Sequence, residues 1–201
     1  MPRRVFSFDQ PDRFIVGAIG QPGRRTFYIQ ASKGAQVVSV ALEKAQVALL
    51  AERLATLLLA LRQGGVAIGD ELPGPAPALS EPIVEQFRVG TLTLGWDGDA
   101  GQVVIEAREL GEEDEEDDED EDEDEDEEPA AAEAEASLPS LVAALDDPRD
   151  VIRVQLEPRD ALEFASGALE VVRAGRPPCP QCGAPLDPTG HFCARRNGYT
   201  H

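Results

Sequence analysis

The cysteines of this chain lie close together near its end and have the spacing of metal ligands. Cys179 and Cys182 form a Cys-x-x-Cys pair that is followed by Gly183, and Cys193 is the third and last cysteine. A proline inside the pair and a glycine after it favour a tight turn whose backbone amides point at the sulfurs. Redox-active dithiols share this spacing, but they normally open a helix, whereas prolines and glycines surround this pair. The sequence therefore predicts a metal-binding tail.

A histidine has to complete the ligand set. Structural zinc sites have four tetrahedral ligands, which are thiolates or imidazoles, and the chain has two histidines, His191 and His201. His191 lies in a glycine-led turn and is preferred, while His201 would need a longer wrap of the chain, so the choice stays open. We expect a structural Zn²⁺ held by Cys179, Cys182, His191 and Cys193, because four protein ligands leave no position for a catalytic water.

Few groups outside this tail could perform catalysis. Both histidines lie in the tail, so the body has no imidazole base, and no serine stands in a nucleophile elbow. The glycine-rich stretch 17–23 opens no helix, which argues against a phosphate-binding loop. A small polar site could combine Asp9 and Asp12 with Arg24 or Arg25, although Asp12 is more readily explained as a turn residue before a strand.

The formal net charge of −21 comes mainly from one segment. Of the 39 acidic residues, 17 form the unbroken run 112–128, which leaves 22 acidic against 18 basic residues elsewhere. Such a run cannot bury apolar surface, so we expect a disordered, solvating insertion over residues 109–149. The alternative is a bait for a basic partner. The run would repel duplex DNA, so we expect no DNA partner.

The composition also indicates a compartment. The first residues lack the apolar stretch of a signal peptide, and the longest apolar stretch, 54–61, is too short to span a bilayer. Three cysteines clustered in one tail do not suggest a disulfide framework. We therefore expect a cytoplasmic protein without a membrane partner.

Hydrophobic periodicity predicts two similar series of elements around a proline-rich linker, 69–82. Each series consists of three strands and a helix, at residues 13–19, 25–31, 36–42 and 44 to about 63, and at residues 86–94, 102–107, 151–156 and 158–174. Apolar residues at helical spacing should face the core: Val47, Leu50, Leu54 and Leu58 in the first helix and Ala161, Phe164, Ala168 and Val172 in the second.

The two series can be aligned with each other. Identical residues fall at equivalent positions of the strands, among them Phe14 and Phe87, Val16 and Val89, Ile29 and Ile105, and Val40 and Val154. Chance similarity of amphipathic segments is the alternative, but the shared order of elements favours a duplication. We expect an α+β fold in which two pseudo-repeated βββα units pack as one domain, edge to edge or helix against helix.

The predicted organisation follows from these elements. The first βββα unit is residues 1–68 and the second, with its acidic insertion, is residues 83–175. A small zinc-ribbon-like tail occupies residues 176–201.

Several motifs together resemble a known family, and they lie at residues 8–14, 20–27, 40–44 and 179–199. The chain resembles uncharacterised actinobacterial proteins that form a domain-of-unknown-function family, some of them called "repeat protein". The resemblance implies a soluble cytoplasmic protein with no assigned activity. It also implies a gene neighbourhood with a phosphatase of the phosphoglycerate-mutase type and a protein resembling a lipid-kinase fold. Ala194 stands where the family often has a proline, which leaves the ligands unchanged.

Three functions are compatible with these observations. The preferred hypothesis is a non-enzymatic protein-interaction module with a structural zinc site and an unidentified protein partner. An alternative is an enzyme, or an accessory subunit of one, that acts on a phosphorylated substrate held by Arg24 and Arg25. A second alternative is RNA binding through Arg195, Arg196 and Tyr199 of the tail.

Overall fold

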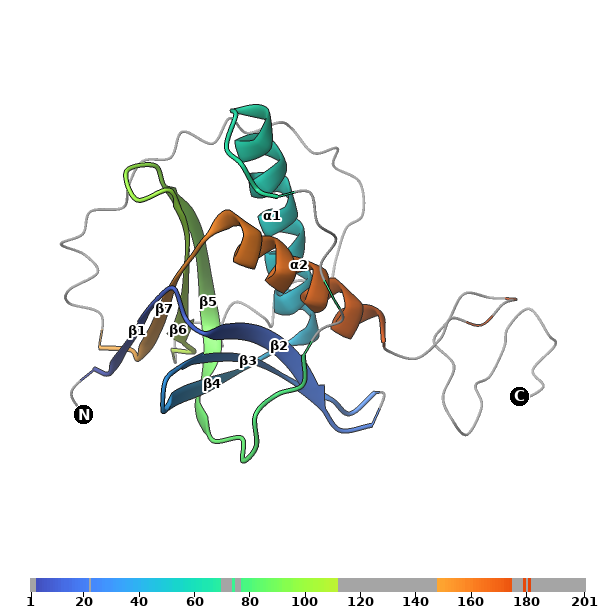
Figure 1. Ribbon diagram of the computed structural model, residues 1–201. Coiled ribbons are helices and arrows are strands. Elements are labelled where there is room, and N and C mark those ends of the chain that lie inside the picture. Colours follow the sequence, from blue (N-terminus) through green and yellow to red (C-terminus); the bar gives the residue numbers. More distant parts are fainter. Residues whose placement is uncertain are drawn as a thin grey trace.

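A computed structural model describes residues 3–21, 23–69, 74, 77–111, 148–174, 179 and 181. Within these residues the chain forms strands and two helices (Figure 1). The elements are β1 (Val5–Asp9), β2 (Arg13–Ile19), β3 (Thr26–Lys33), β4 (Gln36–Leu42), α1 (Lys44–Gln63), β5 (Glu85–Asp97), β6 (Gln102–Glu109), β7 (Val151–Leu156) and α2 (Pro158–Arg173). The α+β class is confirmed.

The strands form one mixed sheet in the order β1-β7-β6-β5-β4-β3-β2. Strands β2, β3 and β4 pair antiparallel, as do β5, β6 and β7. Parallel pairing of β4 with β5 joins these two groups edge to edge, and β1 pairs parallel with β7. After β1, the order of elements is three strands and a helix in each half, as the periodicity predicts.

Strand β1 was not predicted. It is five residues long, and its fourth residue, Phe8, is buried at 2% exposure. Val5 pairs with Val151, so the partner of this strand lies almost at the other end of the described chain. A short N-terminal segment with two phenylalanines becomes a strand only through this distant pairing, which local periodicity does not reveal.

The connection between β1 and β2 determines the curvature of the sheet. These strands are its two edges, yet only residues 10–12 join them. Four Cα–Cα steps of about 3.8 Å reach at most about 15 Å, whereas the edges of a flat seven-stranded sheet would lie about 29 Å apart at about 4.8 Å per strand. The sheet must therefore curl until its edges approach each other, and both helices lie on one side of the curled sheet (Figure 1).

Hydrogen bonds fasten this short connection to its neighbours. Gln10 has a left-handed backbone, with φ of 48°, and its N–H donates to the carbonyl of Gln155 at 2.9 Å. The carboxylate of Asp12 accepts the N–H of Gly34 at 2.7 Å. The turn is thus attached to β7 on one side and to the β3–β4 turn on the other.

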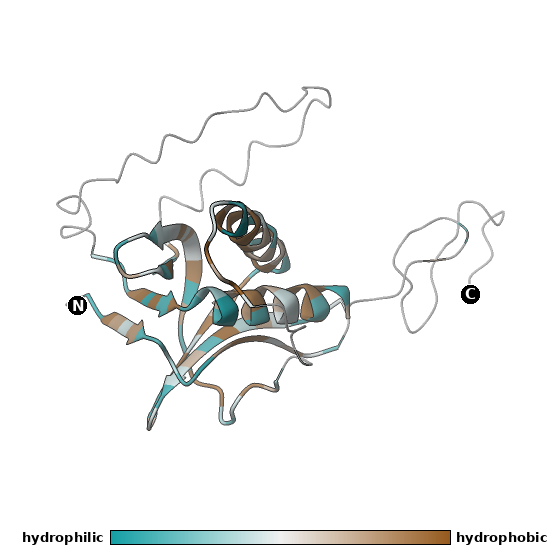
Figure 2. Ribbon diagram, turned by 45° about the horizontal axis from the view of Figure 1, so that its top comes forward, coloured by the Kyte–Doolittle hydropathy of each residue, from teal (hydrophilic) through white to brown (hydrophobic). Residues whose placement is uncertain are grey.

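The helices pack against each other and against the sheet, and they form one hydrophobic core with it. The predicted core residues of α1 are buried, as are Ala161, Phe164 and Ala168 of α2, while Val172 is only partly buried. Apolar and polar segments alternate along α2 (Figure 2). Within the described residues, neither helix is both long and apolar enough to cross a bilayer.

Each helix packs across the two halves and not only against the three strands of its own half. Among the strands, α2 packs mainly against β2, the first strand of the other half, and α1 packs against β5 as well as β3. The curl of the sheet explains this exchange, because it brings the β2 edge round to α2. Each helix therefore ties the two halves together.

The parallel joint between β4 and β5 is short and irregular, and side chains of α1 reinforce it. The amide of Gln46 donates to the carbonyls of Val89 and Gly90, at 3.0 and 3.1 Å, where a bulge interrupts β5. At the start of the helix, Glu43 forms an ion pair with Arg88 at 2.6 Å. These contacts hold the N-terminus of α1 on β5.

The end of the predicted linker is attached to the sheet. The amide of Gln30, which is 2% exposed, donates to the carbonyl of Ser80 at 3.1 Å and accepts the Ser80 N–H at 2.8 Å. A Cβ added at Gly17 would lie 2.5 Å from the side chain of Leu79, so this glycine permits the close approach. Residues 79 and 80 therefore pack on β2 and β3 and do not form a free spacer.

The described residues that flank segment 112–147 are bonded to each other. The N–H of Glu109 donates to the carbonyl of Asp150 at 2.9 Å, and the Asp150 N–H donates to the Glu109 carboxylate at 3.1 Å. Arg4 donates from its backbone and from Nε to the Asp150 carboxylate, both at 2.7 Å. Burial opposes the charge on Asp150, but the hydrogen bonds and charge of Arg4 outweigh it and lower the pKa of that carboxyl.

Because β6 and β7 are already adjacent at Glu109 and Asp150, we expect segment 112–147 to be dispensable for folding. Replacing its 36 residues by a turn of about five should leave unfolding cooperative. It should also raise the unfolding free energy by about 2 kcal/mol, because closing a shorter loop costs less conformational entropy. Urea denaturation measures this change. A neutral Gly/Ser segment of the original length is the control for charge. Loss of cooperative unfolding in the short variant would contradict the expectation.

Asp150 should make stability depend on pH. Its native pKa is lowered, so its contribution is complete above the unfolded value of 3.8 and is lost as pH falls through the native pKa. We expect Asp150→Asn to lower the unfolding free energy by about 2 kcal/mol at neutral pH. The difference from wild type should vanish in acid, and urea denaturation from about pH 2 to 8 measures it. Asp99→Asn in an exposed turn is the control, and a difference that does not change with pH would refute the assignment.

Candidate functional site

The structure describes the beginning of the predicted metal-binding tail. Cys179 is buried at 6% exposure, and its sulfur accepts the backbone N–H of Gln181 at 3.4 Å. An amide that points at the first sulfur from two residues later is what the predicted turn requires. The other ligand candidates lie outside the described residues: Cys182, His191, Cys193 and His201. In the described part, no group of three or more His, Cys, Asp or Glu residues is arranged to hold a metal.

The RNA-binding hypothesis concerns the same region. Arg195, Arg196 and Tyr199 also lie outside the described residues. Both tail functions therefore stay predictions.

The possible polar site of aspartates and arginines is not formed. Asp12 directly precedes β2, whereas Arg24 and Arg25 follow the turn at the other end of this seven-residue strand, about 20 Å away. Arg25 donates to the carbonyl of Ala174 at 2.8 Å, just beyond α2. A cation there is favoured by the negative end of the helix dipole. Arg25 thus stabilises the end of a helix and does not join the carboxylates.

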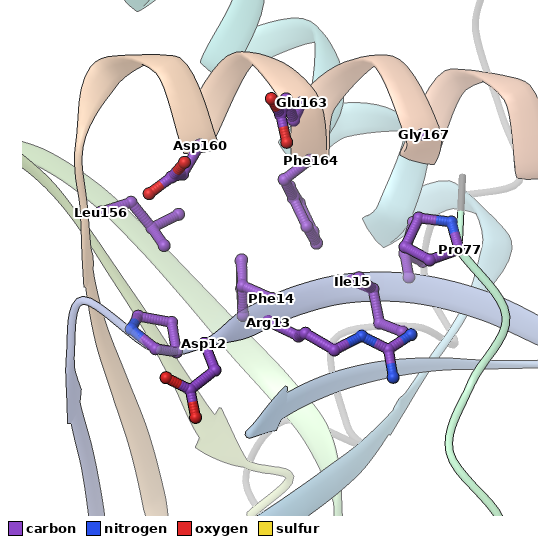
Figure 3. A pocket seen from close by; sticks show the side chains of 12 residues that line it. Asp12, Arg13, Phe14, Ile15, Pro77, Leu156, Asp160, Glu163, Phe164 and Gly167 are labelled. Carbon is purple, nitrogen blue, oxygen red and sulfur yellow. The ribbon is translucent and has the colours of Figure 1, made fainter. Parts of the chain in front are cut away.

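A pocket that the sequence did not reveal lies between α2 and β2, the edge strand (Figure 3). Its cavity volume is about 170 Å³. Phe14 from β2 and Phe164 from α2 point toward one another inside it, with ring centroids 4.4 Å apart and ring planes at 25°. The lining residues are Pro11, Asp12, Arg13, Phe14, Ile15, Val16, Pro77, Leu156, Asp160, Glu163, Phe164 and Gly167.

Two of the charged lining residues form hydrogen bonds within the protein. The carboxylate of Asp12 points away from the phenyl rings and accepts the Gly34 N–H (Figure 3). The guanidinium of Arg13 donates to the carbonyl of Ala78 at 2.7 Å and to the hydroxyl of Ser80 at 3.0 Å. These two side chains therefore serve the turn and the segment after Pro77.

The other two charged lining residues, Asp160 and Glu163, come from α2. Partial burial, together with the nearby carboxylates of Glu157 and Glu163, raises the pKa of Asp160 above its ordinary value. Glu163 lies 3.5 Å from Arg159 in an exposed pair along the helix, and such pairs contribute little. The pocket thus combines an aromatic interior with a negative rim.

No local signal identifies this pocket in the sequence. Phe164 was expected on the core side of its helix, whereas Phe14 was assigned only to a strand and Asp12 to a turn. They form one site only because the curl of the sheet places β2 against α2, and these elements are about 150 residues apart in the chain.

Comparison with known proteins places the chain in a family. A family model described as "Protein of unknown function (DUF3090)" matches residues 6–193. Neither the curated proteins nor the solved structures contain a match. The matched region includes the three cysteines and His191, and it ends before His201.

Proposed function

We propose that this chain, which belongs to the DUF3090 family of proteins of unknown function, is a cytoplasmic protein-interaction module that performs no chemistry of its own. The observation that carries the proposal is the pocket between β2 and α2. At about 170 Å³ it is smaller than the usual small-molecule site of about 300–1,000 Å³. It is open beside an edge strand, where a partner segment can lie along the backbone and insert a side chain.

The contacts of Arg25 weaken the alternative of a phosphorylated substrate. That alternative needs Arg24 and Arg25 as clamps, and Arg25 instead donates to the Ala174 carbonyl. The acidic rim of the pocket would also repel a phosphate. A protein partner therefore fits the described geometry better.

A structural zinc site in the tail is the second part of the proposal. Its support is the buried sulfur of Cys179 with the Gln181 N–H directed at it. Because the family match ends at Cys193, it contains His191 but not His201, which favours His191 as the fourth ligand. Zinc would supply the folding energy of a tail that is too short to form a hydrophobic core of its own.

We also propose that the two halves arose by duplication. The order of three strands and a helix occurs twice, and α1 contacts β5 as α2 contacts β2. Strand β5 lies parallel beside β4, whereas β7 pairs in parallel with β1, the strand that precedes the first half. The helices of the two halves thus have equivalent neighbours.

Metal analysis tests the zinc site. We expect the purified full chain to hold about one Zn²⁺, measured by native mass spectrometry and elemental analysis. Cys182→Ser and His191→Ala should lose the metal, because three ligands do not complete a tetrahedral site. His201→Ala is the matched control and should keep it. Loss of metal in His201→Ala with retention in His191→Ala would reverse the ligand assignment.

Cross-linking in cells tests the interaction. We expect a protein partner that survives ribonuclease and is joined by a carboxylate-reactive cross-linker to Asp160 or Glu163, because these side chains border the proposed site. Mass spectrometry of the cross-linked peptides locates the contact. Glu52 on α1 is an exposed control carboxylate away from the pocket. Recovery of RNA alone, with binding that weakens steeply as salt rises, would favour the RNA-binding alternative.

A further inference from the structure

We propose that the pocket between β2 and α2 receives an arginine side chain of a partner protein, with the guanidinium against Phe14 and facing the carboxylates of Asp160 and Glu163. This inference rests on the proposed function as an interaction module and deepens it, because it names the group that the module binds.

The size and lining of the pocket limit the occupant. A volume of about 170 Å³ is below the usual range of small-molecule sites and suits one long side chain. The walls are apolar where Leu156, Phe14 and Phe164 line them, and the charged groups are at the rim. An occupant therefore needs an apolar stem and a charged end, as arginine and lysine have.

The charges of the rim favour a cation. Asp12 and Arg13 are bonded within the protein, which leaves Asp160 and Glu163 to face a ligand. Among the described residues, Asp160 has no hydrogen bond or ion pair through its side chain, and the only ion pair of Glu163 is the exposed one with Arg159. Two carboxylates one helical turn apart repel each other, so an arriving positive charge relieves a repulsion that the free protein contains.

The raised pKa of Asp160 agrees with this geometry. Burial and the carboxylates of Glu157 and Glu163 raise the pKa of Asp160, and the opposing effect of Arg159 does not cancel this rise. Negative potential therefore dominates at Asp160, although the guanidinium groups of Arg159 and Arg13 are also near the rim.

The aromatic pair favours arginine over lysine. Of the two stacked rings, Phe164 is buried, while Phe14 stays partly exposed toward the pocket. A planar guanidinium can stack on a phenyl ring and at the same time donate several hydrogen bonds to carboxylates. A lysine ammonium is a compact, strongly hydrated charge that cannot do both.

Titration of the isotope-labelled full chain with small peptides tests the inference. The probes are blocked pentapeptides of glycine with a central arginine, lysine or citrulline. We expect the arginine peptide to shift the backbone NMR signals of Phe14, Phe164 and Gly167, the lysine peptide to bind more weakly, and the neutral citrulline peptide not to bind. The double variant Asp160→Asn/Glu163→Gln should bind the arginine peptide about tenfold more weakly.

Matched variants and alternative occupants complete the design. Glu52→Gln/Glu170→Gln removes the same charge from exposed helix positions outside the pocket and should bind like wild type. Equal affinity in both double variants, equal binding of citrulline, or shifts confined to other surfaces would overturn the inference. If the pocket signals of the peptide-free protein shift in the Arg195→Gln/Arg196→Gln variant, the occupant is the chain's own tail and not a partner. If these signals shift with protein concentration, the occupant is a second copy of the chain.

The two proposals fail in different ways. If cross-linking finds a protein partner that the Asp160→Asn/Glu163→Gln variant still binds, the arginine site is wrong and the interaction module stands. If the arginine peptide occupies the pocket but no cell protein cross-links to the chain, the pocket chemistry stands and the proposed function is wrong.

Discussion

The three-residue connection between β1 and β2 is the constraint on which this structure depends. It joins the two edges of a seven-stranded sheet, and the sheet can satisfy it only by curling. The curl carries β2 to α2, stacks Phe14 on Phe164 and leaves the pocket between them. Hydrogen bonds from Gln10 and to Asp12 hold the connection in place. The candidate site is therefore a product of sheet closure rather than of a local motif.

Polar side chains complete the places where regular pairing is weak. Gln46 satisfies two carbonyls at the bulge of β5, and Gln30 bonds the backbone of Ser80 on the other face of the sheet. Asp150 and Arg4 join the start of β7 to the start of β1. An unpaired amide or carboxylate in these positions would cost more than one hydrogen bond contributes, so each contact also specifies the arrangement of the strands.

The parts of the fold that depend on local pattern were predictable. Strands 13–19, 36–42 and 151–156 were expected with the bounds that the structure has, because apolar residues mark their buried positions. Strand β1 and the pocket were not expected, since both depend on residues about 150 positions apart that meet only in the folded chain. The zinc ligands stay a prediction of spacing, supported at Cys179 alone.

The pairing of Val5 with Val151 has a consequence for biosynthesis. Translation runs from β1 towards β7, so β1 is synthesised well before the strand with which it pairs in the described sheet. Until the second half of the chain has been translated, the phenylalanines of β1 lack their native neighbours and are exposed to water or bound by a chaperone. The pairing of β1 with β7 can therefore form only after β7 has been synthesised, late in the folding of the described residues.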